Sequence, residues 1–199
     1  MVLRAEHIHK SFGKKKVLED LSLEVHPATI CGIVGENGSG KSTLLKILVG
    51  EWKPSKGSVE MKGQMGYCPQ QISLYSQLTV QEHFRYFGAA YRMPPDALKD
   101  RQEHLLDYFN FGKYRSERVA HLSGGTAQKL NLSLALLHDP DLLILDEPYS
   151  GFDWDTYTRF WDYLGQLKKS SCSVLVVSHF ITEKSIFDRI YTLENGRLQ

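Results

Sequence analysis

One short stretch of the sequence combines the residue types that bind phosphate. The segment GENGSGKS lies between the apolar run TICGIV and the leucine-rich KSTLLKILVG, and it matches the motif G-x-x-x-x-G-K-[ST]. Glycines let backbone amides close on an anion, and amides at a helix start carry partial positive charge. Lys41 adds a full charge for the β- and γ-phosphates, and Thr43 can donate to an α-phosphate oxygen. We predict a nucleoside triphosphate site formed by Gly35, Asn37, Gly38, Ser39, Gly40, Lys41, Ser42 and Thr43.

Two acidic residues end a second apolar run. In LLILDEP, residues 142–145 are apolar, and Asp146 and Glu147 follow them. Ligands bind at the carboxyl ends of strands in open α/β sheets. Asp146 through water, together with the Ser42 hydroxyl, supplies the hard oxygen ligands that suit Mg²⁺. Glu147 is placed to polarise the attacking water as a general base. For these two residues alone a solvated acidic turn would be the better interpretation, but a phosphate loop with Mg²⁺ needs such a carboxylate.

Strand-like and helical patterns alternate along the chain and must position these groups. Loose period-two alternation in VLRAEHIHKSF and VLEDLSLEV predicts strands with one solvated face, and GSVEMKG and QMGYC predict further short strands. The apolar runs TICGIV, DLLILDEP and SCSVLVVSH predict buried strands, and DWDTYTRFWDYLGQLKK predicts a helix between the last two. This alternation favours an α/β fold with a mainly parallel sheet and an N-terminal antiparallel part.

Residues 71–122 have a different, helical texture and are predicted to form a subdomain inserted within a single domain of residues 1–199. Thr79 and Glu82 form a T-x-x-E capping box at the start of a helix, which Pro94 and Pro95 end. A second helix is predicted over DALKDRQEHLLDYF. Aromatic residues recur along the first helix at i, i+3 and i+7, and we expect this stripe to bury a small core of its own; it consists of Phe84, Phe87 and Tyr91.

Composition excludes several other classes of protein. The formal net charge is +1, which disfavours a dedicated nucleic-acid binder, so no nucleic acid is expected as a partner. The three cysteines show no metal-ligand spacing and are predicted to be reduced and mostly buried. No apolar run approaches the ~18 residues of a membrane span, and the first residues lack the apolar core of a signal peptide. We therefore expect a cytoplasmic protein.

Ordered motifs around the two sites give the chain a specific resemblance. The segment HLSGGTAQKLNLSLALLHDPDLLILDEP contains LSGG about twenty residues before the acidic strand end, and YSGFD, VVSH, YCPQ and KSFG lie elsewhere in the chain. In this order, the motifs resemble those of the ATP-binding cassette (ABC) ATPase family across nearly the whole chain. The resemblance implies a P-loop NTPase core, with ATP and Mg²⁺ as cofactors.

The resemblance also implies roles for individual residues. His179 matches the switch histidine, and Gln70 matches the Q-loop glutamine, which senses the γ-phosphate and contributes to the metal site. Phe12 lies where the family keeps an aromatic residue against adenine. The implied catalytic set is Lys41, Gln70, Glu147 and His179; the implied metal ligands are Ser42, Gln70 and Asp146; the D-loop adds Asp153. A lone histidine would more often be a core residue, so these roles depend on the resemblance.

The signature LSGG provides a second anion-binding helix start. Ser123 is a helix-capping residue type, and Gly124 and Gly125 expose amides. A single γ-phosphate needs only one such site from one chain, and the resemblance implies that the signature of one protomer closes on ATP held by the other. The expected assembly is a head-to-tail homodimer, or a heterodimer with a related cassette.

Departures from the family pattern and two functional hypotheses remain. Thr126 replaces a common glutamine in the signature, and the D-loop carries the bulky Tyr149, Phe152 and Trp154, whose role the sequence leaves open.

The resemblance favours the ATPase subunit of a transporter, attached to a separate integral membrane permease at the inner face of the membrane, with a lean toward export. The alternative is a soluble ABC ATPase that assembles or remodels a macromolecular complex. Leu74, Tyr75 and Leu78 are the candidate docking residues.

Overall fold

The computed structural model describes residues 1–179, 181 and 184–199. Among these residues, a six-stranded sheet of order β5-β6-β7-β3-β8-β9 forms the centre of the molecule. Its strands are β3 (Ile30–Val34), β5 (Met65–Cys68), β6 (Leu142–Asp146), β7 (Ser173–Ser178), β8 (Arg189–Glu194) and β9 (Arg197–Leu198). All neighbours from β5 to β8 pair in parallel, and β9 pairs with β8 antiparallel. The predicted mainly parallel sheet is confirmed.

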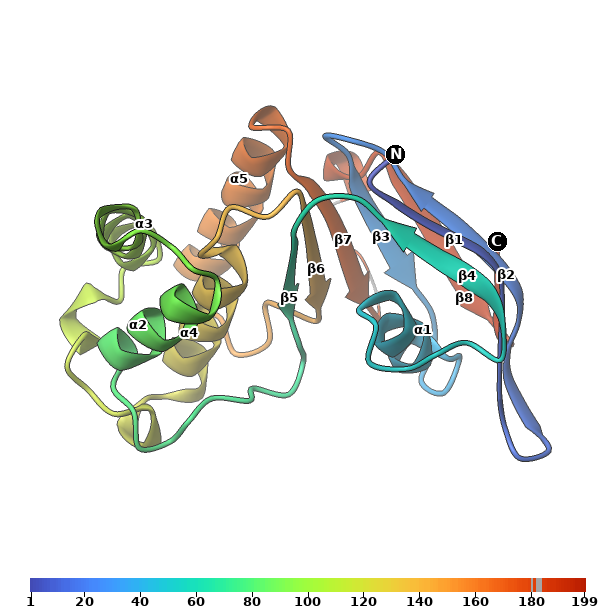
Figure 1. Ribbon diagram of the computed structural model, residues 1–199, viewed down its shortest axis with the longest axis horizontal. Helices are drawn as coiled ribbons and strands as arrows, with labels where there is room; N and C mark the ends of the chain where they lie inside the picture. Colours follow the sequence, from blue (N-terminus) through green and yellow to red (C-terminus); the bar gives the residue numbers. More distant parts are fainter. Residues whose placement is uncertain (180, 182–183) are drawn as a thin grey trace.

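The first part of the chain forms a separate antiparallel sheet of order β2-β1-β4. Its strands are β1 (Leu3–Phe12), β2 (Lys15–Val25) and β4 (Lys56–Met61). In β1 and β2, buried residues alternate with more exposed ones, which matches the predicted strands with one solvated face. In Figure 1 this sheet lies at the right with helix α1 (Lys41–Leu48), and the β1–β2 hairpin projects from it.

The remaining helices gather at the opposite end of the molecule (Figure 1). They are α2 (Val80–Ala90), α3 (Pro95–Tyr108), α4 (Gly124–Leu136) and α5 (Trp154–Lys169), with the 3₁₀ turns η1 (Gly112–Tyr114) and η2 (Val119–His121). A further 3₁₀ turn, η3 (Lys184–Ile186), directly precedes β8. None of the helices among the described residues is long and apolar enough to cross a membrane. Residues 71–122 contain α2, α3, η1 and η2; their status as an inserted subdomain within one domain of residues 1–199 stays a prediction.

The central sheet separates two hydrophobic clusters. Val174 and Val176 of β7 belong to the cluster with α2 to α5, whereas Leu175 and Val177 belong to the cluster with α1 and the N-terminal strands. This alternation follows from the period of two along a strand, and it explains why β7 is apolar on both faces. Both clusters therefore hold the ends of β3 and β6 in fixed relative positions.

Local signals in the helical region mostly had their predicted effect. Thr79 caps α2 by accepting from the Glu82 amide at 3.2 Å, and Glu82 accepts from the Thr79 amide at 2.7 Å. In the aromatic stripe, Phe84 is fully buried as predicted, but it belongs with Phe87 to the large cluster shared with α4, α5 and the central sheet, so the predicted separate small core is wrong. Tyr91 is 39% exposed and instead stacks on His138, with ring centroids 3.8 Å apart.

Candidate functional site

The loop between β3 and α1 has a backbone that only glycine allows at two points. Gly38 and Gly40 have φ of 83° and 112°, in the left-handed region that other residues rarely adopt. A Cβ on Gly40 would also lie 2.9 Å from Leu18 Cδ2 and 3.2 Å from the Val17 carbonyl oxygen. The loop thus curls tightly beneath β2, and its amides lead into the start of α1. This geometry suits a phosphate group.

Lys41, the first residue of α1, is turned back onto the loop. Its Nζ donates to the carbonyl oxygens of Gly35 at 2.6 Å and Glu36 at 2.9 Å. Burial lowers the pKa of Lys41, while Glu147 and Asp146 oppose that effect. The Ser39 hydroxyl in the same loop is buried and makes no hydrogen bond among the described residues. The loop therefore holds one ammonium group and one free hydroxyl that an anionic ligand can take up.

A cavity of about 350 Å³ brings the two predicted halves of the site together. Most of the residues singled out from the sequence line it: Asn37, Gly38, Gly40, Lys41, Ser42, Thr43, Gln70, Asp146, Glu147 and His179. Lys15 and Val17 of β2 also line it, and sequence reasoning missed both. Lys15 belongs to the basic turn GKKK, whose charge was visible but whose position over the loop depends on how β2 packs.

Four side chains form a continuous polar chain across this cavity. Gln70 Nε2 donates to Glu147 Oε2 at 3.0 Å, and Glu147 Oε1 lies 2.6 Å from His179 Nε2. His179 Nδ1 in turn lies 3.5 Å from Lys41 Nζ. Glu147 has a φ of 47°, a backbone conformation that a non-glycine residue seldom adopts and that is common at functional sites. The structure therefore assembles the whole predicted catalytic set around one carboxylate.

Asp146 is held in an environment that disfavours its charge. Burial raises its pKa to about 6, with a further contribution from Glu147, and Lys41 and His179 only partly offset this. A buried carboxylate beside a second carboxylate is better accommodated when a cation neutralises it. The oxygen donors of Ser42, Gln70 and Asp146 on this cavity fit Mg²⁺, which prefers hard oxygen ligands and keeps several waters. The predicted metal ligands are thus chemically suitable.

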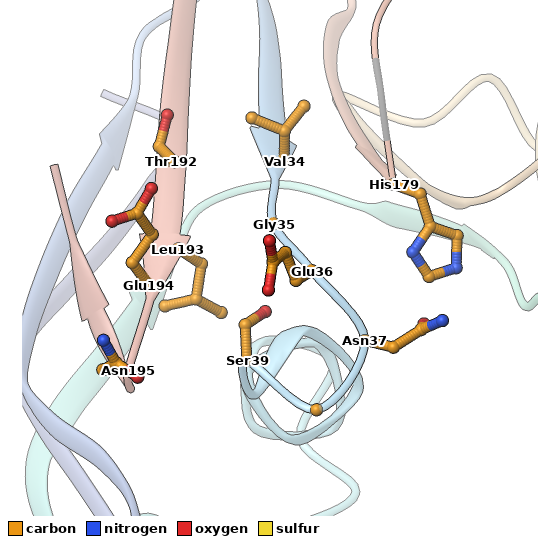
Figure 2. A pocket seen from close by; sticks show the side chains of 11 residues that line it. Val34, Gly35, Glu36, Asn37, Ser39, His179, Thr192, Leu193, Glu194 and Asn195 are labelled. Atoms are coloured by element: carbon orange, nitrogen blue, oxygen red, sulfur yellow. The ribbon is translucent and has the colours of Figure 1, made fainter.

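A second hollow, of about 540 Å³, lies on the other side of the phosphate loop. Figure 2 shows Asn37 and His179 on one side of it, and Glu194 and Asn195 at the end of β8 on the other. Ser39 and Gly35 of the loop line the space between them. A Cβ on Gly35 would meet the Leu193 carbonyl oxygen at 2.4 Å, so this glycine allows the loop to lie against β8. The loop is therefore accessible from two sides.

The signature residues lie at the start of α4. Ser123 is the N-cap, and its Oγ accepts from the Thr126 amide at 3.2 Å and pairs with Thr126 Oγ1 at 2.9 Å. Gly124 and Gly125 are the first two residues of the helix, as predicted. Thr126, which replaces a common glutamine, is buried and completes this cap. None of Ser123, Gly124 and Gly125 lines the cavity that contains Lys41 and Glu147.

Two predicted site residues have structural surroundings of a different kind. Phe12 is 46% exposed at the end of β1, and its ring meets the ring of Trp52 edge-on at 5.3 Å. Asp153 caps α5 by accepting from the Thr156 amide at 2.8 Å. Both roles in nucleotide binding stay predictions.

Of the bulky D-loop residues, Tyr149 bonds through its hydroxyl to Ser178 Oγ, and Phe152 packs against the hydrophobic core. Trp154 is 79% exposed. For Tyr149 and Phe152, packing accounts for the size of the side chain.

The comparison with protein families decides the classification. The model of the ABC transporter family matches residues 18–150 of the chain. The chain belongs to this family. The matched range includes the phosphate loop, the signature and the acidic end of β6, so the chain is an ABC ATPase cassette.

Curated relatives agree with this assignment over different shares of their own length. The chain is 32% identical over 196 residues to an uncharacterised ABC transporter ATP-binding protein of Methanocaldococcus jannaschii, covering 98% of this chain and 75% of that protein. It is 30% identical over 210 residues to the linearmycin resistance ATP-binding protein of Bacillus subtilis, covering 99% of this chain and 68% of that protein. The chain spans only 29% and 30% of the length of two ABC transporter G family members of Dictyostelium discoideum.

Solved structures show the same fold. A structure described as the ATP-binding subunit of an ABC transporter matches with a TM-score of 0.95 at 28% identity, covering 100% of this chain and 88% of that one. A dimeric cassette in a post-hydrolysis state, bound to ADP and Pi, matches with a TM-score of 0.89 at 24% identity, covering 99% and 96%. The predicted α/β cassette fold is confirmed.

Proposed function

We propose that this chain hydrolyses MgATP and thereby powers a separate membrane permease. The observation that carries the proposal is the placement of Glu147: its two carboxylate oxygens contact Gln70 and His179 at 3.0 Å and 2.6 Å. A general base must be held within hydrogen-bond reach of the water that it activates. Asp146, the last residue of β6, has no hydrogen bond of this kind within the described part of the chain, and we assign it to the metal side of the site.

The residues divide the work in a definite way. The loop amides and Lys41 bind the phosphates, and Lys41 must leave the carbonyl oxygens of Gly35 and Glu36 to do so. Ser42, Gln70 and Asp146 would hold Mg²⁺, which supplies charge neutralisation when bound. Glu147 then accepts a proton from the attacking water, and His179 and Gln70 keep its carboxylate in position. Phe12 contributes an aromatic ring for the base.

The active form that we propose is a dimer of cassettes. Ser123 and Gly124 lie outside the cavity of their own chain, with open space beside Gly124, and we place them against ATP held by a second cassette. An identical second cassette and a related one would give the same head-to-tail contacts. A solved cassette with the same fold is itself dimeric, so the fold is compatible with such an assembly.

The surface proposed for the permease lies beside Gln70. Tyr75 is 52% exposed, and it forms with Leu78 and Tyr86 the main wall of a mostly open, apolar hollow of about 390 Å³. Leu74, by contrast, packs against the hydrophobic core, so Tyr75 and Leu78 are the better docking residues. An apolar permease helix seated there would move when the cassettes close. The same attachment would hold the protein peripherally at the inner face of the membrane.

Export is the direction that relatives favour. Among them are the linearmycin resistance protein, a probable multidrug ABC transporter ATP-binding protein of Escherichia coli and a Nod factor export ATP-binding protein of Ralstonia nicotianae. The alternative, a soluble ABC ATPase that remodels a complex, would use the same ATP site but a soluble partner on the Tyr75 surface.

The test is a pull-down from gently solubilised membranes with the tagged chain. A variant with Tyr75→Glu and Leu78→Glu should lose an integral membrane partner while its own ATPase activity stays intact. Lys99→Glu, an added negative charge on the exposed side of α3, is the matched control and should retain the partner. Recovery of soluble partners only would reject the transporter proposal in favour of the alternative.

A further inference from the structure

Two buried amide side chains on α4, the helix that begins at the signature, bond to the chain segments that contain Gln70 and Glu147. Gln128 and Asn131 are 2% and 7% exposed, and they lie one turn apart on α4. Gln128 Nε2 donates to the Pro148 carbonyl oxygen at 3.0 Å. Asn131 Nδ2 donates to the Pro69 carbonyl oxygen at 3.1 Å. Buried polar side chains in such positions hold the chain segments that they bond.

The two carbonyl groups stand next to the reacting residues. Pro69 directly precedes Gln70, and Pro148 directly follows Glu147. Because proline fixes φ, a hydrogen bond to its carbonyl oxygen restrains the neighbouring residue closely. The side chains of the two neighbouring residues are also joined, since Gln70 Nε2 donates to Glu147 Oε2 at 3.0 Å. The side-chain amides of Gln128 and Asn131 and the contact between Gln70 and Glu147 therefore restrain the same two chain segments.

The amides are also joined to one another. Asn131 Nδ2 lies 3.5 Å from Gln128 Oε1 and 3.3 Å from the sulfur of Cys68. Cys68 is the last residue of β5 and is fully buried. The arrangement is thus one connected group that runs from the Gln70 loop through α4 to the Glu147 loop. Its helix begins with Ser123, at the residues predicted to meet a second ATP.

We propose that Asn131 and Gln128 are positioning residues that set the distance between Gln70 and Glu147 and link it to the signature helix. Both are buried and neither lines the cavity around Lys41 and Glu147, so they act through Gln70 and Glu147. A movement of α4 on closing against a second cassette would shift both loops together. The inference rests on the proposed hydrolytic function of this same site.

The first test is Asn131→Ala, which removes the donor to the carbonyl oxygen of the half-buried Pro69. We expect kcat for ATP to fall about tenfold while KM changes less than about twofold, because loop placement is affected more than phosphate binding. Amide hydrogen exchange of residues 71–78 should become faster in the nucleotide-free chain. Ser133→Ala is the matched control, since Ser133 is buried on the same helix and, within the described residues, its hydroxyl donates only to the Lys129 carbonyl oxygen.

A double-mutant cycle separates positioning from general stability. In a Gln70→Ala background, Asn131→Ala should lower kcat no further, because the residue through which it acts is absent. Equal losses in both backgrounds would overturn the proposal, as would an unchanged kcat with a lower Tm alone. If Asn131→Ala does not fold, Asn131→Ser retains a shorter donor and is put through the same cycle. A wild-type chain without ATPase activity would instead contradict the proposed function, and unchanged exchange of residues 71–78 would still count separately against the positioning role.

Discussion

Two regions of the cassette that are predicted to face nucleotide differ in how their polar groups are satisfied. Around the phosphate loop, the polar side chains form a continuous series of contacts that runs from Gln70 through Glu147 and His179 to Lys41. At the signature, Ser123 caps its own helix, and a Cβ on Gly124 would meet no described atom within 4 Å. The first region is nearly complete within one chain. The second has open space beside Gly124, as the proposed composite site between two cassettes requires.

The largest effect is expected where the comparison places the chemistry. Glu147→Gln keeps the size and hydrogen bonding of the side chain but cannot take a proton, so kcat should fall about a hundredfold or more with ATP still bound.

Lys41→Ala should remove activity by weakening phosphate binding, whereas Lys46→Ala on the same helix should not. Steady-state ATPase assays with nucleotide-binding measurements check this. Full turnover of Lys41→Ala would contradict the assignment of the loop.

A pair of adjacent glycines sharpens the comparison at the signature. A Cβ on Gly125 would lie 2.5 Å from the Gly151 carbonyl oxygen in the D-loop, whereas one on Gly124 has open space. Gly125→Ala should therefore lower the free energy of unfolding by about 1 to 3 kcal/mol, since backbone must shift. Gly124→Ala should leave the free energy of unfolding within about 0.5 kcal/mol of wild type. Equal losses in chemical denaturation would show that α4 and the D-loop are not packed as described.

The phosphate-loop region should gain stability when its disfavoured charge is removed. The raised pKa of Asp146, about 6, means that the folded chain binds its proton more tightly than the unfolded chain does. Asp146 therefore costs stability increasingly as pH rises from about 4 through 6, and the cost is complete above that range. Asp146→Asn should be more stable at pH 7.5 by on the order of 1 kcal/mol after solvent screening, and inactive. A lower Tm than wild type at pH 7.5 would contradict this environment.

The smallest effect is expected at the edge of the site. Phe12→Ala should raise KM for ATP about two- to fivefold with little change in kcat, because a contact to the base is the same in ground and transition states. Initial-rate kinetics over a range of ATP concentrations measure both constants. A large loss of kcat at constant KM would remove Phe12 from base binding and make its contact with Trp52 a structural one.

Much of the fold and of the site was predictable because local chemistry determines them. The capping box at Thr79, the glycines of the phosphate loop and the apolar runs that became β3, β6 and β7 each specify their own geometry. The paired strands β8 and β9 were not predicted, since their short segment near the end of the sequence has no strong pattern. Lys15 and Glu194 were missed because only tertiary packing brings them beside the loop.

The buried amides illustrate a further limit of sequence reasoning. Asn131 lies in an apolar run, where a lone asparagine gives no indication of its partners. Only the structure shows that its Nδ2 reaches the Pro69 carbonyl oxygen from 62 positions further along the chain. Asp153 was similarly assigned to nucleotide by resemblance, and its helix cap became visible only with α5 in place.

The central claim is that ATP binds between two cassettes, with Lys41 and Glu147 from one and Ser123 from the other. The most direct measurement is the molar mass of Glu147→Gln by light scattering during sizing, at tens of micromolar chain with and without MgATP. We expect a monomer without nucleotide, a dimer with MgATP, and a monomer again when Ser123→Arg is added. A monomer under all three conditions, or a dimer that ignores Ser123→Arg, would contradict it.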